Sequence, residues 1–210
     1  MNECVAPLVI VVDDDASLRK ALVFLLESVG WRVAAYDSAE AFLAALDDLN
    51  QPGCLILDVR MPLMSGLELQ RTLNERDIQL PVIFLTGHAD VTIAVQAMKF
   101  GASDFIEKPF KDQTLLDAVS HAVRRDLMRH KENATKTLLS ERLSKLTLRE
   151  MEVARLVVEG LPYKAIGMRL YISERTVQVH CQNLKSKLGI NSSAELTQLL
   201  LQLNDHKGTQ

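Results

Sequence analysis

The chain has 210 residues, of which 48% are hydrophobic and 24% are charged. This composition is typical of a globular protein, and the length suits two small domains better than one of average size. The three cysteines are odd in number and have no metal-ligand spacing, so we expect neither a disulfide framework nor a structural zinc site. The sequence shows no basic leader and no apolar stretch of membrane-spanning length, and we expect a cytoplasmic protein that does not enter a membrane.

The net charge of −3 is divided unevenly along the chain. Residues 1–125 carry 11 Lys or Arg against 18 Asp or Glu, whereas residues 126–210 carry 13 against 9. An acidic half beside a basic half predicts a metal-binding module joined to a module that binds a polyanion. Solvated surfaces that differ in sign by chance would give the same numbers, so charge alone leaves both readings open.

The first half alternates short apolar runs with segments of helical periodicity. Strands are predicted at 8–12, 32–36, 54–57, 81–85 and 104–106, and helices at 16–29, 38–47, 66–75, 90–100 and 112–130. The apolar runs are continuous rather than alternating, as expected of strands buried on both faces. Five strand–helix units predict an α/β domain over residues 1–125 with a five-stranded, parallel, doubly wound sheet of the flavodoxin-like type.

After the last predicted strand the pattern is helical only. A polar helical segment over 126–142 predicts a linker, and four helices are predicted near 147–159, 162–170, 174–188 and 192–203. Thr147 and Glu150 have the spacing of a capping box, and Ser173 is a predicted N-cap. Two helices joined by a tight turn predict a small all-α, four-helix domain of helix-turn-helix type over residues 143–210.

Polar residues follow four of the predicted strands: Asp13 and Asp14, Asp58, Thr86, and Lys108. Parallel strands end at the same edge of a sheet, where α/β proteins bind ligands. Clustered carboxylates repel each other unless a cation intervenes, and carboxylate oxygens with water suit Mg²⁺. A lysine and a hydroxyl can bind phosphate oxygens, so the set predicts phosphoryl transfer to Asp58.

Each of these residues also has an ordinary structural reading. Aspartates at strand ends often cap helices, and Asp15 is a predicted N-cap of this kind. A metal-dependent phosphatase of the haloacid dehalogenase type is a second reading, because Asp13 is followed two residues later by Asp15. The phosphatase pattern requires a threonine at position 17, however, where this chain has Ser17. That reading also leaves the basic half of the chain unexplained.

The segment 174–188 has an apolar stripe at helical spacing, formed by Val177, Cys181, Leu184 and Leu188. Amide, basic and small apolar side chains share the remaining surface, and these groups suit the major groove of DNA. With Lys164 of the preceding helix, the predicted contacts are Arg175, Thr176, Gln178, Val179, Gln182, Asn183, Lys185 and Lys187. A solvated amphipathic helix is the plain alternative for this segment taken alone.

Four motifs resemble the receiver domain of two-component response regulators: Val11-Val12-Asp13-Asp14, residues 57–66, Leu85-Thr86-Gly87-His88 and residues 105–110. The resemblance implies that Asp58 accepts a phosphoryl group from a histidine kinase. It implies Mg²⁺ held by Asp14, Asp58 and the main-chain carbonyl of Arg60, and by Asp13 through water. It also implies a switch pair of Thr86 and Phe105, and a cis bond between Lys108 and Pro109.

Four further motifs resemble the LuxR-type helix-turn-helix: residues 146–150, 165–170, 172–180 and 187–190. Together the two resemblances indicate the NarL/FixJ family, and within it the FixJ-like branch. They imply a transcription regulator whose phosphorylation promotes dimerisation and DNA binding, with RNA polymerase as a candidate partner. No enzymatic activity is implied beyond self-phosphorylation from a phosphodonor and weak autodephosphorylation.

The sequence departs from the family pattern at a few positions. Gln178 and Ser193 stand where the family commonly has cations, and Pro162-Tyr163 replaces a small polar pair. These changes bear on affinity and target sequence rather than on the mode of binding. A DNA-binding factor with an inert or ligand-gated receiver remains the alternative. A last set of apolar residues either extends a dimer or packs in the core: Leu196, Leu199, Leu200 and Leu203.

Overall fold

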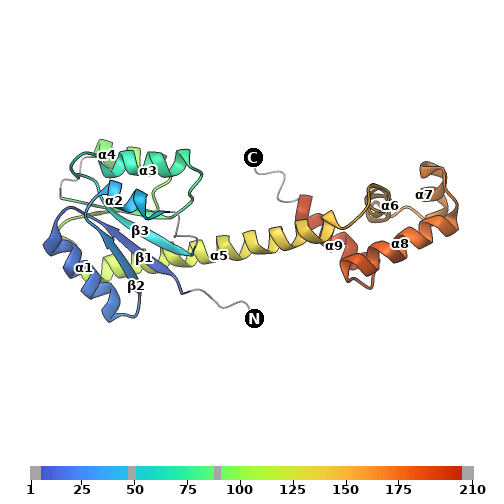
Figure 1. The fold of residues 1–210 in the computed structure, drawn as a ribbon, viewed down its shortest axis with the longest axis horizontal. Coiled ribbons are helices and arrows are strands. Elements are labelled where there is room, and N and C mark those ends of the chain that lie inside the picture. Colours follow the sequence, from blue (N-terminus) through green and yellow to red (C-terminus); the bar gives the residue numbers. More distant parts are fainter. Residues whose placement is uncertain (1–5, 47–50, 88–90, 205–210) are drawn as a thin grey trace. The chain divides into compact units, whose positions relative to one another are not determined.

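The computed structural model describes residues 6–46, 51–87 and 91–204. The chain forms two compact units, Met1–Lys131 and Glu132–Gln210, and each is described by itself. Figure 1 shows strands and helices in the first unit and helices alone in the second. The boundary between the units falls between the two predicted domain boundaries, within the segment expected to be a linker.

The first unit is a five-stranded parallel sheet with the strand order β2-β1-β3-β4-β5. The strands are β1 (Leu8–Val12), β2 (Arg32–Tyr36), β3 (Gly53–Asp58), β4 (Val82–Thr86) and β5 (Asp104–Glu107). Each begins and ends within one residue of its predicted bounds. The flavodoxin-like doubly wound sheet is therefore confirmed.

Helices cover both faces of this sheet. They are α1 (Ala16–Ser28), α2 (Ala39–Ala44), α3 (Gly66–Glu75), α4 (Val91–Lys99) and the first part of α5 (Asp112–Ser144). The prediction for α2 ran to residue 47 and that for α4 began at residue 90; both residues lie outside the described ranges. One hydrophobic core joins the sheet to α2, α3 and α4, and a second joins it to α1 and α5.

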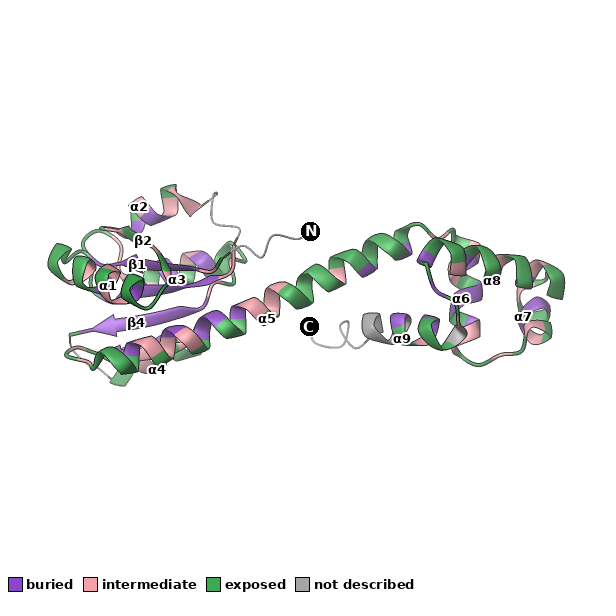
Figure 2. Ribbon diagram, turned by 90° about the horizontal axis from the view of Figure 1, so that it is seen from below, coloured by how far each residue is buried: buried purple, intermediate pink, exposed green. Residues whose placement is uncertain are grey.

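The sheet is buried most completely at its centre. Every residue of β1, β3 and β4 is buried, whereas the edge strand β2 is partly exposed, and β4 stands out as continuously buried in Figure 2. Burial on both faces explains why these runs are apolar throughout, since a polar side chain would be desolvated on either side. The central strands therefore form a rigid base for the residues that follow their carboxyl ends.

The second unit contains α6 (Leu148–Val158), α7 (Tyr163–Leu170), α8 (Glu174–Leu188) and α9 (Ser193–Asn204), together with the end of α5. Leu139 and Leu143 of α5 belong to its hydrophobic core. Leu196 and Leu199 of α9 are buried in the same core, which favours core packing for these two leucines. The side chains of Leu200 and Leu203 lie outside the described part of the structure.

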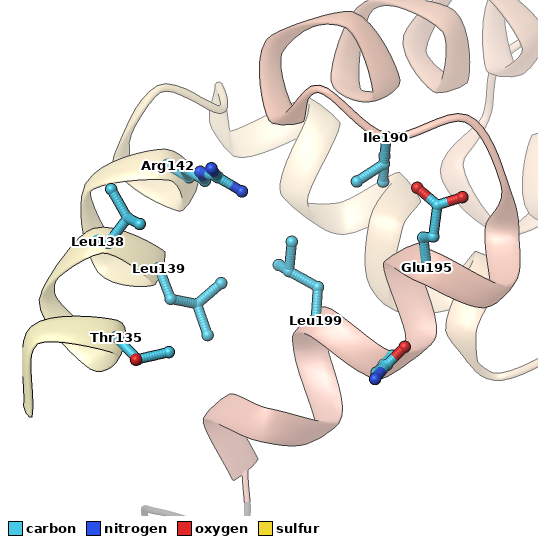
Figure 3. Close-up of a pocket in the computed structure, with 8 residues that line it drawn as sticks. Thr135, Leu138, Leu139, Arg142, Ile190, Glu195 and Leu199 are labelled. Atoms are coloured by element: carbon cyan, nitrogen blue, oxygen red, sulfur yellow. The ribbon is translucent and has the colours of Figure 1, made fainter. Parts of the chain in front are cut away.

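A pocket of about 290 Å³ separates the end of α5 from α9 within the second unit. In Figure 3, Leu139 of α5 and Leu199 of α9 point toward each other across it, with Ile190 above them. Beside this pocket, Leu139 and Leu143 are part of the hydrophobic core, so the last turns of α5 pack as part of the second unit. The sequence could not reveal this, because the polar pattern of residues 126–142 resembles that of a solvated connector.

The ends of the helices follow the predicted capping residues. Asp15 accepts hydrogen bonds from the main-chain N–H groups of Ser17 and Leu18, and Ser173 accepts one from Thr176. Gly189 ends α8 in the left-handed conformation, with φ of 66°, which a residue without Cβ adopts freely. At 33 residues α5 is long, but no helix within the described ranges is both long and apolar enough to cross a membrane.

Candidate phosphoacceptor site and DNA-binding helix

The parallel register brings two aspartates to the same edge of the sheet. Val12 of β1 pairs with Leu57 of β3, so the residues that come next in each chain segment, Asp13 and Asp58, lie beside each other. Lys108, which follows β5, contacts both: its Nζ lies 2.9 Å from Oδ2 of Asp13 and 2.6 Å from Oδ1 of Asp58. Strand ends that are 95 and 50 residues from Lys108 in sequence thus meet at one ammonium group.

Both carboxylate oxygens of Asp58 have a partner. Oδ1 accepts a hydrogen bond from Lys108, and Oδ2 accepts one from the main-chain N–H of Arg60 at 2.7 Å. Burial raises the pKa of Asp58, and the negative charge of Asp13 adds to this, while the bonds from Lys108 and Arg60 oppose it. The carboxylate is therefore fixed in orientation and partly desolvated, which suits an acceptor group.

Lys108 has the complementary electrostatics. Burial alone would lower the pKa of this lysine, but its hydrogen bonds to Asp58 and Asp13 and their charges outweigh burial, so that its pKa is raised. Lys108 is consequently a permanent cation at neutral pH. The peptide bond that it forms with Pro109 is cis, as the resemblance implies.

The other acidic residues after β1 have separate roles. Asp13 is buried and accepts a hydrogen bond from the main-chain N–H of Asp15, whereas Asp14 is exposed. Arg19 of α1 donates a hydrogen bond to the main-chain carbonyl of Asp13 at 2.6 Å, a contact that sequence reasoning missed. Within the described residues, no group of three His, Cys, Asp or Glu side chains is gathered for a metal ion.

The predicted switch residues lie on adjacent strands. Thr86 is buried at the end of β4, and its carbonyl accepts a hydrogen bond from the N–H of Lys108 at 2.7 Å. Phe105 of β5 is half-buried and packs on Phe84, with ring centroids 6.3 Å apart. A main-chain contact thus joins Thr86 to the residue that binds Asp58. His88 lies outside the described residues.

Gly66 lies against the main chain of Asp58, and we predict that Gly66→Ala disturbs this aspartate. Gly66 is the first residue of α3, and a Cβ atom there would lie 2.2 Å from the main-chain carbonyl oxygen of Asp58. This distance is much shorter than any contact that real Cβ atoms make. The backbone of Asp58 must move, so we expect a loss of about 1–3 kcal/mol in unfolding free energy and slower phosphorylation.

Urea unfolding and the rate of phosphoryl incorporation measure these two effects of Gly66→Ala. Gly87→Ala is the control for stability, because a Cβ there meets nothing within 4 Å. Equal stabilities of the two variants would contradict the predicted clash.

In the second unit, α8 has the two faces predicted from the sequence. Val177, Cys181, Leu184 and Leu188 are all buried in the core. The predicted DNA contacts are exposed at Lys164, Arg175, Gln178, Val179, Gln182 and Asn183, and half-buried at Thr176 and Lys185. This arrangement leaves a polar surface of one helix available to a partner.

Lys187 differs from the other predicted contacts. Its Nζ lies 2.7 Å from Oε2 of Glu150, a buried residue in the capping box of α6. The hydrogen bond from Lys187 holds the pKa of Glu150 below its ordinary value of 4.5, and the main-chain N–H of Thr147 adds to this effect, while burial opposes it. One of the predicted phosphate contacts is thus already paired within the protein.

The lowered pKa predicts a pH dependence of stability. A depressed folded-state pKa means that ionised Glu150 stabilises the fold above pH 4.5, and that this contribution is lost as the pH falls through the lower folded-state value. We expect Glu150→Gln to be less stable than the wild type at neutral pH, and the difference to shrink below pH 4.5. Calorimetric unfolding of both proteins between neutral and acid pH measures this, and a difference independent of pH would contradict it.

Comparisons with known proteins agree with both halves of this description. Residues 9–120 match the family model of the response regulator receiver domain, and residues 144–200 match that of bacterial regulatory proteins of the luxR family. The FixJ transcriptional regulatory protein of Azorhizobium caulinodans is 43% identical over 191 residues, which cover 91% of this chain and 90% of FixJ. The chain belongs to the NarL/FixJ family of two-component response regulators. Its second half is a DNA-binding helix-turn-helix domain of the LuxR type.

Other relatives match this chain over most of their length. This response regulator is 39% identical to the response regulator protein TodT of Pseudomonas putida over 202 residues, covering 95% of this chain and 88% of TodT. Among solved structures, the response regulator StyR superimposes with a TM-score of 0.85 at 42% identity, covering 93% of this chain and 98% of StyR. Full-length FixJ from B. japonicum gives a TM-score of 0.59 at 39% identity, covering 93% and 96%.

Proposed function

We propose that Asp58 accepts a phosphoryl group from a histidine kinase, and that phosphorylation promotes dimerisation and sequence-specific DNA binding to regulate transcription. The observation that carries this proposal is the geometry of Asp58, whose two oxygens are held by the ammonium of Lys108 and the N–H of Arg60. A buried carboxylate oriented in this way is ready to attack an electrophile at the sheet edge.

In the proposed reaction, a carboxylate oxygen of Asp58 attacks the phosphorus of a phosphohistidine. The new P–O bond forms as the P–N bond breaks, and the electron pair leaves with the imidazole nitrogen. Lys108 offsets the negative charge that collects on the phosphoryl oxygens, and buried Thr86 can offer a hydroxyl to one of them. We expect no turnover of another substrate beyond slow hydrolysis of the resulting acyl phosphate.

Two of the implied donors, Asp13 and Asp58, meet at the sheet edge and suit Mg²⁺, which would supply charge neutralisation for the incoming phosphoryl group. Carboxylates of Asp13 and Asp58 already converge on one cation, Lys108, and carboxylate oxygens are hard ligands. With Asp14 and the main-chain carbonyl of Arg60, these residues would hold the metal.

The proposed output begins at the Thr86 end of β4. Inward movement of Thr86 toward the phosphoryl group would leave room for Phe105 to turn inward. The neighbouring α4 has large exposed apolar side chains at Val91, Val95 and Met98, which are suited to a dimer interface. A dimer would place two α8 helices about one turn of DNA apart. Once bound to DNA in this way, the dimer could contact RNA polymerase.

The experiment that tests the proposal compares wild type and Asp58→Asn, each with and without beryllofluoride. Light scattering gives the mass, and a DNA-binding titration gives the affinity. We expect a dimer and tighter binding only for the wild type with beryllofluoride. Four identical results would favour the phosphorylation-independent alternative, and no DNA binding in any condition would contradict the function proposed for α8.

A further inference from the structure

We propose that Lys187 is a positioning residue, which fixes the recognition helix α8 on α6 through Glu150 and makes no phosphate contact. This inference rests on the function proposed above for α8. It reassigns one of the predicted DNA contacts, and it identifies Glu150, which is buried at the start of α6, as a determinant of specificity.

The ion pair between Lys187 and Glu150 joins two helices of the second unit. Glu150 is only 3% exposed, and its Oε2 atom accepts hydrogen bonds from the main-chain N–H of Thr147 at 2.8 Å, from its hydroxyl at 3.0 Å, and from Lys187 at 2.7 Å. Lys187 lies in the last turn of α8, 37 residues away in sequence. One oxygen atom therefore joins the start of α6 to the end of α8.

The same turn of α6 also holds the other helix of the helix-turn-helix. Arg149, the neighbour of Glu150, donates through Nη2 to the main-chain carbonyl of Leu170, the last residue of α7. Its Nη1 is paired with Glu152 on α6 itself. Two consecutive side chains thus fix the ends of α7 and α8 against a single helical turn.

Electrostatics favour keeping the Lys187 pair when DNA binds. The side chain of Lys187 is 37% exposed, but if it turned to a phosphate, the buried carboxylate of Glu150 would lose its cation and keep only its hydrogen bonds from Thr147, which is unfavourable. A lysine neutralised by Glu150 also has little net charge with which to release counterions from DNA. Lys185 serves as the contrast: it is half-buried on the same helix, where Lys187 is exposed, but the described residues show no ion pair for it.

The position of the pair explains how it would affect recognition. A helix of 15 residues is about 22 Å long, and α8 is fixed to α6 near its carboxyl end. A small change of tilt there displaces the side chains along the rest of the helix, including Gln178 and Gln182. Base contacts depend on accurate geometry, whereas non-specific attraction to phosphates does not.

The test uses the full-length protein and two duplexes: the one that wild type enriches from a randomised pool, and a scrambled duplex of equal length. Lys187→Met and Lys185→Met change the net charge equally. For Lys185→Met we expect the slope of log affinity against log salt to fall by about 1, with the ratio of specific to non-specific affinity unchanged. For Lys187→Met we expect an unchanged slope and a ratio about tenfold lower.

Two further variants separate positioning from general damage. Glu150→Gln keeps a residue that can serve in a capping box, yet it should lower the specificity ratio as Lys187→Met does, although it removes a negative charge. The double variant should lose no more than either single one, and Lys187→Arg should restore the ratio. All titrations are made below the melting transition of each variant, because a partly unfolded protein loses both affinities equally and keeps its ratio.

The outcomes are distinguishable. A salt slope that falls by about 1 for Lys187→Met, with the ratio unchanged, would assign Lys187 to a phosphate and overturn the proposal. A normal ratio for Glu150→Gln would overturn it as well, even if Lys187→Met failed to fold. Absence of specific binding by the wild type would instead contradict the function proposed for α8.

Discussion

Asp58→Asn should lower the rate of phosphoryl incorporation from a small phosphodonor by on the order of 10³-fold or more, because it removes the proposed nucleophile. The amide is nearly isosteric, so the site should keep its shape, with Lys108 still paired to Asp13. Intact mass after incubation with acetyl phosphate and Mg²⁺ measures the incorporation directly.

Asp37→Asn is the matched control for this prediction. Asp37 follows β2 at the same edge of the sheet, but it is exposed and accepts a hydrogen bond from Ser38. We expect this variant to incorporate phosphoryl groups like the wild type. Undiminished incorporation into Asp58→Asn would show that another residue is the acceptor.

The second large effect is expected for Asp126→Ala. Asp126 of α5 is only 1% exposed, and its Oδ2 accepts a hydrogen bond from the main-chain N–H of Gly53 at 2.9 Å. Its Oδ1 lies 2.5 Å from Nη2 of Arg129, and its Oδ2 lies 3.5 Å from Nε2 of His130. The substitution leaves the buried N–H of Gly53 without its acceptor and the partly buried guanidinium of Arg129 without its counter-ion, which should cost about 3–5 kcal/mol of unfolding free energy.

Urea unfolding of the first unit measures the effect of Asp126→Ala. The fluorescence of Trp31, the one tryptophan of the chain, reports on this unit. Asp117→Ala is the control, since Asp117 is an exposed acid on the same helix, and its loss should change stability by no more than about 0.5 kcal/mol. Similar midpoints for the two variants would mean that Asp126 does not anchor α5 to β3.

The meeting of Asp13, Asp58 and Lys108 could be predicted from the sequence because it follows from the parallel arrangement of the strands. Parallel strands end at one edge, so polar residues after Val12, Leu57 and β5 had to meet, and the structure joins Asp13, Asp58 and Lys108. The side-chain contacts that helices make have no comparable register from which they could be predicted. The pairs Arg19 with Asp13 and Lys187 with Glu150 depend on how helices pack, and periodicity does not encode that.

The fold was predictable for a related reason, but the prediction missed how the last turns of α5 pack. Buried strands and amphipathic helices have strong periodic signals, and their bounds agree closely with the structure. Residues 126–144 bury few side chains per turn, so the pattern gave no sign that Leu139 and Leu143 enter a core. Helices of this kind are held by a few contacts rather than by a continuous apolar face.

The division of α5 between two cores has a consequence for exchanging domains among regulators of this family. A chimera joined at 125/126 would separate Asp126 from the Gly53 N–H that it caps, and one joined at 142/143 would remove Leu139 from the second core. Residues 131–135 are all exposed, so foreign sequence is best accepted there. Although α5 resembles a simple spacer, the receiver and DNA-binding domains of different regulators can therefore be joined only within this short part of the helix.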